Sequence, residues 1–133
     1  MAKFTHEPEI SATHGIVQTI KLLSHDENIS IGAAIWHADA LTFDGVIQIL
    51  EFQIDPTSRR QGFGKLLMGE LVRQATAYQS LRKIPLRRLW ISLRQKKQIQ
   101  ARAFVSSVGF IHLGTVKELL TDEDAMIYVR TFD

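Results

Sequence analysis

The chain has 133 residues, a length that suits one domain with one hydrophobic core. It is 45% hydrophobic and 23% charged, as ordinary globular proteins are, and its lack of cysteine excludes disulfides, thiolate metal ligands and a cysteine nucleophile. No apolar stretch approaches the ~18 residues of a membrane span. The N-terminal residues lack the apolar segment of a signal peptide, so we expect a cytoplasmic protein.

Positive charge is concentrated in one third of the chain. Residues 59–102 contain 12 of the 16 Lys and Arg residues and a single acidic residue, Glu70, so this segment carries a formal charge of +11 and the rest carries −9. Charge segregated in this way is typical of a place where a polyanion docks, although it also occurs on solvated faces of a helix and a loop. Because the charges surround a glycine-bearing loop, we favour a nucleotide-bearing cofactor over nucleic acid.

The first half of the chain predicts an antiparallel meander. Residues 1–15 are polar, contain Pro8 and show no periodicity, so they form either a short strand or an arm. Runs of β-branched and apolar residues predict the next strands. We expect these strands at residues 16–23, 29–37 and 46–54. No helix separates them.

The second half alternates helices and strands. Leu67, Leu71 and Ala75 recur at helical spacing and predict a helix over residues 62–79. The further elements are expected as a strand at 88–93, a helix at 98–108 and strands at 110–113 and 125–130. Because a helix that returns the chain to the same sheet joins parallel strands, the fold class is α/β (α+β). We expect one domain over residues 1–133, with a mixed, mostly antiparallel sheet of about six or seven strands and two main helices.

A basic loop with two glycines joins the strand at 46–54 to the first helix. After Asp55-Pro56 and two further residues the chain reads Arg59-Arg60-Gln61-Gly62-Phe63-Gly64-Lys65. The first N–H groups of a helix lack partners within it and lie at its positive end, so they suit a phosphate. The glycines remove side chains from that place and permit positive φ. The loop is neither a P-loop nor a Rossmann fingerprint.

The order strand, Asp-Pro, Arg-x-x-Gly-x-Gly and amphipathic helix resembles the acetyl-CoA-binding motif of the GNAT acyltransferases, a family of N-acetyltransferases. The resemblance covers about residues 16–130. Within it, Ala101-x-Ala103-Phe104 followed by Gly109-Phe110 is similar to the family's second cofactor helix. It implies a GNAT-like fold, acetyl-CoA as co-substrate, and transfer of the acetyl group to a primary amine by direct attack.

The resemblance also implies which residues hold the cofactor. The loop would bind the pyrophosphate, and the pantetheine amides would pair with the central strand where that strand splays from the one at 88–93. The cofactor-binding residues expected on this basis are Phe52, Ile54, Arg59, Arg60, Gln61, Gly62, Phe63, Gly64, Lys65, Gln98 and Phe104.

Three departures from the family pattern concern catalysis. The family usually has one or two helices between its first two strands, on the acceptor side, and residues 1–16 leave no room for them. Gln48 stands where the histone-acetyltransferase branch has its glutamate base, and Val105 stands where the family often has a tyrosine acid. Glu51 is the only carboxylate inside the central strand, so we assign it as the catalytic base. Strict alternation places it on the face opposite Gln48 unless a bulge intervenes.

Two function classes therefore follow from the resemblance. The first is an acetyl-CoA-dependent N-acetyltransferase acting on an amine-bearing small molecule or a protein. The alternative is a catalytically weak or inactive GNAT-like module that binds acyl-CoA as a sensor or assembly partner. Exposed sheet edges and an uncovered acceptor side favour a homodimer. The five histidines show no metal-ligand spacing, so we expect no metal site.

Overall fold

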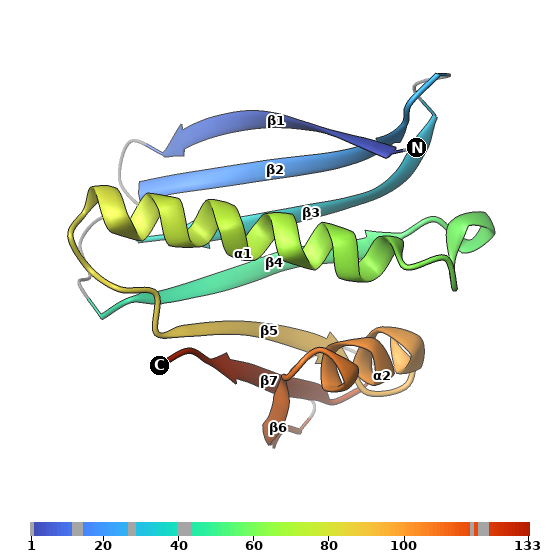
Figure 1. Ribbon diagram of the computed structural model, residues 1–133. Coiled ribbons are helices and arrows are strands. Elements are labelled where there is room, and N and C mark those ends of the chain that lie inside the picture. Colours follow the sequence, from blue (N-terminus) through green and yellow to red (C-terminus); the bar gives the residue numbers. More distant parts are fainter. Residues whose placement is uncertain (1, 12–14, 27–28, 40–43, 118, 120–122) are drawn as a thin grey trace.

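The strands that the structure describes form one sheet with the order β1-β2-β3-β4-β5-β7-β6 (Figure 1). The computed structural model describes residues 2–11, 15–26, 29–39, 44–117, 119 and 123–133. The strands are β1 (Ala2–Ser11), β2 (Gly15–Ser24), β3 (Ser30–Ala38), β4 (Val46–Ile54), β5 (Arg88–Arg94), β6 (Ile111–Val116) and β7 (Ala125–Thr131). The helices are α1 (Phe63–Leu81), α2 (Ile99–Ser107) and the short 3-10 helix η1 (Pro56–Ser58).

The predicted fold class is confirmed. Strand β4 pairs parallel with β5 across the α1 crossover, and the other neighbouring strands pair antiparallel. The sequence left either a strand or an arm open for the N-terminal residues. The structure has a strand there, because β1 pairs with β2 along its whole length. The strand predicted at 110–113 begins one residue later and runs further. Its first predicted residue, Phe110, is buried and donates its N–H to the Val105 carbonyl at 3.0 Å, which closes α2.

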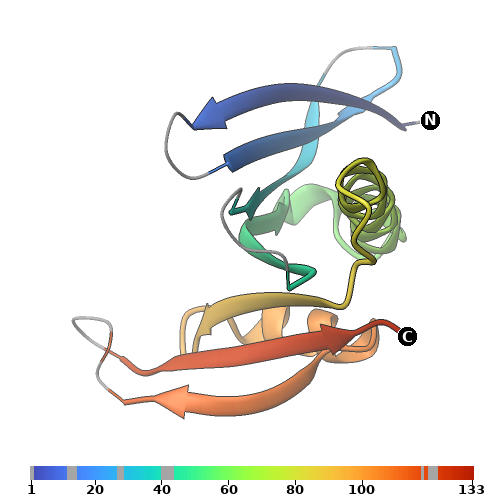
Figure 2. The same cartoon turned by 90° about the vertical axis from the view of Figure 1, so that its left-hand side faces the viewer.

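Both helices lie on the same face of the sheet. On α1, Gln74 accepts a hydrogen bond of 3.1 Å from the indole Nε1 of Trp36 on β3. On α2, Arg102 donates to the hydroxyl of Tyr128 at 3.2 Å. Tyr128, Ile91, Ile49 and Trp36 are successive cross-strand partners, so their side chains share one face. Figure 1 and Figure 2 show the sheet with α1 and α2 to one side of it.

The predicted helix stripe forms the centre of the core. Leu67, Leu71 and Ala75 on α1 are fully buried against β3 and β4. Each large aliphatic side chain removed from water contributes about 1.5–3 kcal/mol, so this stripe fixes α1 on the sheet. The N-terminal end of α1 is thereby held beside the end of β4.

Strand β4 breaks the strict alternation at Leu50. Ile49 pairs with Trp36 and Glu51 pairs with Ile35, so Leu50 is an extra residue, and it is 50% exposed. Before this bulge Gln48 pairs with His37, which lies on the same face of β3 as Ile35. Gln48 and Glu51 therefore share the face opposite the helices. Strict alternation would separate these two side chains, but the bulge, which is the exception stated with that expectation, adds one residue and brings them to one face.

Strands β4 and β5 separate towards their C-terminal ends. Their pairing ends at Ile49 and Ile91, although β4 continues to Ile54 and β5 continues to Arg94. This leaves backbone of β4 beyond Ile49 without a ladder partner on the β5 side. The divergence implied by the resemblance is thus present in the sheet.

Candidate functional site

A cavity of about 990 Å³ lies between the end of β4, the first turn of α1, and α2. This size falls in the range of small-molecule and cofactor sites. Its lining consists of Phe52, Gln53, Ile54, Ser58, Arg59, Arg60, Gly62, Gly64, Lys65, Lys96, Lys97, Gln98, Ile99, Gln100, Ala101, Ala103 and Phe104. Nine of the eleven predicted cofactor residues are among them.

The two predicted residues outside the lining are Gln61 and Phe63. Gln61 is exposed at the loop surface. Phe63 is partly buried and packs against the hydrophobic core instead. Lys96, Lys97 and Gln100 line the cavity but were missed, because the sequence indicates only a polar connection there. Their position becomes clear once β5 and α2 are known to border the same cavity.

The two loop glycines serve different purposes. Gly62 has φ of +82°, and a Cβ added there would meet no heavy atom within 4 Å. It therefore supplies a left-handed backbone on the open side of the loop. Gly64 allows close approach, since a Cβ there would lie 2.8 Å from the ring of Phe104. Arg60 also has positive φ, 65°, which is uncommon for a non-glycine residue and marks a strained loop.

The electrostatics of the first turn of α1 favour an anion. No side chain caps this turn through Gly62, and no acidic residue occurs in it. Arg59, Arg60 and Lys65 instead surround the positive end of the helix dipole, an unfavourable arrangement that a bound anion would reverse. On the outer face of α1, the hydrogen bond from Arg73 to Glu70, and then the charge of that carboxylate, raise the pKa of Arg73.

Two contacts join β4 to α2 across the cavity. The Arg59 guanidinium donates from Nε to the Ile54 carbonyl at 3.3 Å, and also hydrogen-bonds the side-chain oxygen of Gln100. The rings of Phe52 and Phe104 stack at 5.3 Å with an interplanar angle of 14°. The cavity thus has a polar rim at the loop and an aromatic wall towards the separated strands.

No protein-family model matches the sequence, and no curated protein matches it. Solved structures do match. A protein described as a GNAT-family acetyltransferase from Desulfovibrio desulfuricans is 20% identical, with a TM-score of 0.70 over 86% of this chain and 69% of its own. A protein described as a streptothricin acetyltransferase from Bacillus anthracis, in complex with acetyl coenzyme A, is 19% identical, with a TM-score of 0.70. The match covers 88% of this chain and 63% of that one, so this chain spans less than two thirds of that protein. An IAA acetyltransferase from Bacillus cereus is 12% identical, with a TM-score of 0.70 over 98% of this chain and 100% of its own.

The chain has the GNAT acetyltransferase fold. At these identities the likeness establishes the fold, and it confirms the architecture that the glycine-loop resemblance implies. In this GNAT fold, Val105 is 1% exposed and belongs to the core, so it does not face the cavity. The titratable side chains that line the cavity are all basic.

The assigned base lies on the other side of the sheet. Glu51 is exposed and follows the point at which β4 leaves β5. Gln48 lies on the same face, opposite Trp90 of β5, which is half-buried. Within the described ranges no helix covers this face. The cofactor residues and Glu51 therefore border the same divergence of β4 and β5 from opposite faces.

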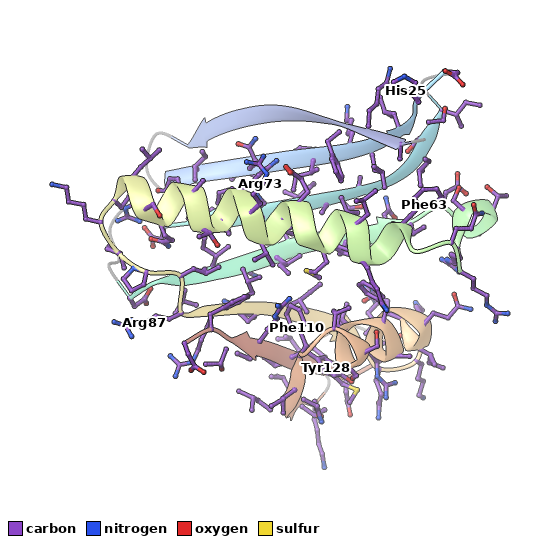
Figure 3. All side chains as sticks on the ribbon, in the orientation of Figure 1. His25, Phe63, Arg73, Arg87, Phe110 and Tyr128 are labelled. Atoms are coloured by element: carbon purple, nitrogen blue, oxygen red, sulfur yellow. The ribbon has the colours of Figure 1, made fainter. Side chains whose placement is uncertain are left out.

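The basic segment divides between two places. Arg59, Lys65 and Lys97 lie at the cavity, whereas Lys83 and Arg87 follow the far end of α1. Figure 3 shows Phe63 near the first turn of the helix and Arg87 near its opposite end. The basic residues of this segment therefore do not all gather at the cavity.

Two features are absent from the described residues. They contain no group of three or more His, Asp or Glu side chains placed to hold a metal ion. Neither α1 nor α2, as far as the structure describes the chain, has a stretch long and apolar enough to span a bilayer.

Proposed function

We propose that the protein is an acetyl-CoA-dependent N-acetyltransferase that acetylates a primary amine by direct attack. The observation that carries this proposal is the cation-ringed cavity at the uncapped start of α1, which opens where β4 and β5 separate. Acetyl-CoA combines several phosphates with a flexible amide-bearing arm. The polar rim would take the phosphates, and the unpaired backbone of β4 would take the arm.

The reacting groups would meet at the divergence of the two strands. The amine nitrogen attacks the thioester carbonyl, a C–N bond forms, the C–S bond breaks, and the electron pair leaves with sulfur. Glu51, on the open face, would accept the proton that the amine loses. Backbone N–H groups of β4 beyond Ile49 are suited to stabilise the oxyanion.

The leaving thiolate has no tyrosine acid at position 105. A thiol with a pKa near ~8.5 leaves tolerably as thiolate at neutral pH, and a general acid typically contributes on the order of 10²–10⁴ in rate. We therefore propose a slow enzyme. The buried Val105 also favours the second candidate, a GNAT-fold module that binds acyl-CoA without turnover.

The experiment has a binding arm and a turnover arm. Calorimetric titration with acetyl-CoA should show binding that Arg59→Ala weakens by about tenfold or more, since a hydrogen bond to a charged group contributes ~1.5–3 kcal/mol. Arg73→Ala, which removes an arginine from the outer face of α1, should leave the affinity unchanged. Absence of binding at sub-millimolar ligand would exclude both candidates.

The turnover arm measures thiol release with a panel of amines. Release with an amine supports the transferase, and binding without release supports the acyl-CoA-binding module. Glu51→Gln should lower kcat by ~10²-fold or more at neutral pH without changing acetyl-CoA affinity. Thr19→Ala, on the same face of the sheet but on β2 and outside the cavity lining, is the matched control. A Glu51→Gln enzyme with full rate from about pH 6 to 9 would remove Glu51 from the mechanism.

The acceptor, the assembly and the compartment belong to the same proposal. The uncovered face beside Glu51 suits either a protein or a small amine, with Trp90 available to pack against it. Homodimerisation through an open sheet edge and a cytoplasmic location complete the proposal.

A further inference from the structure

A buried carboxylate outside the cavity supports the loop that borders it. Glu123, just before β7, is 7% exposed. Its Oε1 atom accepts the backbone N–H groups of Lys96 at 3.0 Å and of Lys97 at 3.3 Å. A buried carboxylate is costly unless it is hydrogen-bonded, and these two donors offset that cost. Figure 2 shows the end of β5 and the start of β7 at the same edge of the molecule.

The loop concerned is the connection between β5 and α2. From the flanking elements, the Arg94 N–H on β5 donates to the Gln98 side chain at 2.7 Å, and the Arg102 guanidinium on α2 hydrogen-bonds the Gln95 carbonyl. Within the loop, the Gln95 N–H donates to the carbonyl of Asp124, which precedes β7, at 3.2 Å. Three consecutive N–H groups, those of residues 95–97, are thus taken by residues 123–124. Of these acceptors, Glu123 is the only side chain.

The orientation of this loop determines where two cavity cations lie. Lys96 and Lys97 line the cavity with exposed side chains. Their ammonium groups are carried on flexible stems, so the place from which they reach the cavity is set by the backbone. Backbone N–H groups without partners would let the loop rearrange towards water.

We propose that Glu123 is a positioning residue of the cofactor site, which holds the β5–α2 loop so that Lys96 and Lys97 face the phosphates of a bound acyl-CoA. This inference rests on the proposed function and adds to it. It assigns a role in cofactor binding to a residue that does not touch the cofactor. It also links the acidic connection between β6 and β7 to the basic cavity.

A double-mutant cycle, read by calorimetric titration with acetyl-CoA, separates positioning from general stability. Glu123→Ala should weaken binding about fivefold to tenfold, whereas Glu123→Gln, which keeps the accepting oxygen, should stay within about twofold. In a Lys96→Ala/Lys97→Ala background, Glu123→Ala should change the affinity less than about twofold, because the residues that it positions are gone. An equal loss in both backgrounds, an equal loss for the two Glu123 variants, or no loss at all overturns the proposal.

Two controls keep the result decisive. Gln74→Ala removes another buried polar side chain, on α1, whose partner Trp36 lies away from the loop. It should lower Tm without changing acetyl-CoA affinity. Amide hydrogen exchange at Lys96 and Lys97 should be about tenfold faster in Glu123→Ala and unchanged in Glu123→Gln. If the unsubstituted protein binds no acetyl-CoA, the proposed function fails and this inference fails with it. If it binds and the cycle is additive, only this inference fails.

Discussion

The two ends of α1 use the same backbone conformation for different purposes. Arg60 before the helix and Lys83 after it both have positive φ, at 65° and 61°. At the C-terminal end, the Lys83 N–H donates to the Ser80 carbonyl at 3.0 Å and the Ile84 N–H donates to the Gln79 carbonyl at 3.0 Å. There the left-handed residue terminates the helix by satisfying its last carbonyls.

The N-terminal end has no comparable termination. The left-handed residues Arg60 and Gly62 lead into a first turn without a side-chain cap. The charged side chains also differ between the two ends of α1. Arg82 lies at the negative end of the helix dipole, where a cation is favourable, and its guanidinium lies 5.6 Å from the ring centre of Tyr78. The cations at the other end oppose the dipole, which indicates that this end is built for an anion.

The largest expected effect comes from replacing the left-handed residue at each end of α1 with glycine. Arg60→Gly and Lys83→Gly each remove one positive charge and relieve a left-handed non-glycine residue, which costs roughly 1 kcal/mol. Arg60→Gly should weaken acetyl-CoA binding by ~10–100-fold, since a hydrogen bond to a charged group contributes about 1.5–3 kcal/mol. Lys83→Gly should raise the free energy of unfolding and leave binding unchanged. Calorimetric titration and urea denaturation of both variants make the comparison.

Arg60→Ala completes that test. It removes the same charge but keeps the backbone strain, so its acetyl-CoA affinity should equal that of Arg60→Gly while its stability is lower by about 1 kcal/mol. If Arg60→Gly bound acetyl-CoA as the unsubstituted protein does, Arg60 would have no role in holding the anion.

A smaller effect tests the close approach of α2 to α1. Gly64→Ala places a Cβ 2.8 Å from the Phe104 ring, and we expect a loss of about 1–3 kcal/mol because the ring must move. Gly69→Ala, on the same helix, meets nothing within 4 Å and should gain about 0.5–1 kcal/mol. Urea denaturation measures both changes. A neutral Gly64→Ala would show that Phe104 yields freely, and the stacked rings of Phe52 and Phe104 would then not form a fixed wall of the cavity.

Local patterns were enough to predict most of the framework. Helical spacing at Leu67 and Leu71 predicted α1. The glycine loop was expected to border a binding site, and most of its residues line the cavity. The bulge at Leu50 was not predictable, since it exists only in the register of β4 against β3. That register decides on which face Glu51 lies, so the face of the assigned base depends on a tertiary contact.

The contribution of Glu123 was equally hidden in the sequence. It precedes β7 in an acidic connection. It contacts two loop residues, Lys97 and Lys96, from which it is separated in the chain by 26 and 27 positions. Composition alone indicates a solvated turn there. Because Ala125 pairs with Arg94, the fold brings the start of β7 beside the end of β5, and only this pairing places the carboxylate on the loop.

The smallest expected effect removes one cation at the C-terminal end of α1. Arg82→Gln loses the contact with Tyr78 and the 3.1 Å hydrogen bond to the Asp39 carbonyl, and we expect the free energy of unfolding to fall by ~0.5–1 kcal/mol. Acetyl-CoA affinity should be unchanged, whereas Arg59→Gln, with the same change of charge at the cavity, should weaken it. If both variants weaken binding equally, and if high salt abolishes the effect in both, net charge governs binding. Exposed charges further away than a Debye length of about 10 Å act only through a screened field, so an equal, salt-sensitive loss would not come from local contacts. The distinction between the two ends of α1 would then disappear.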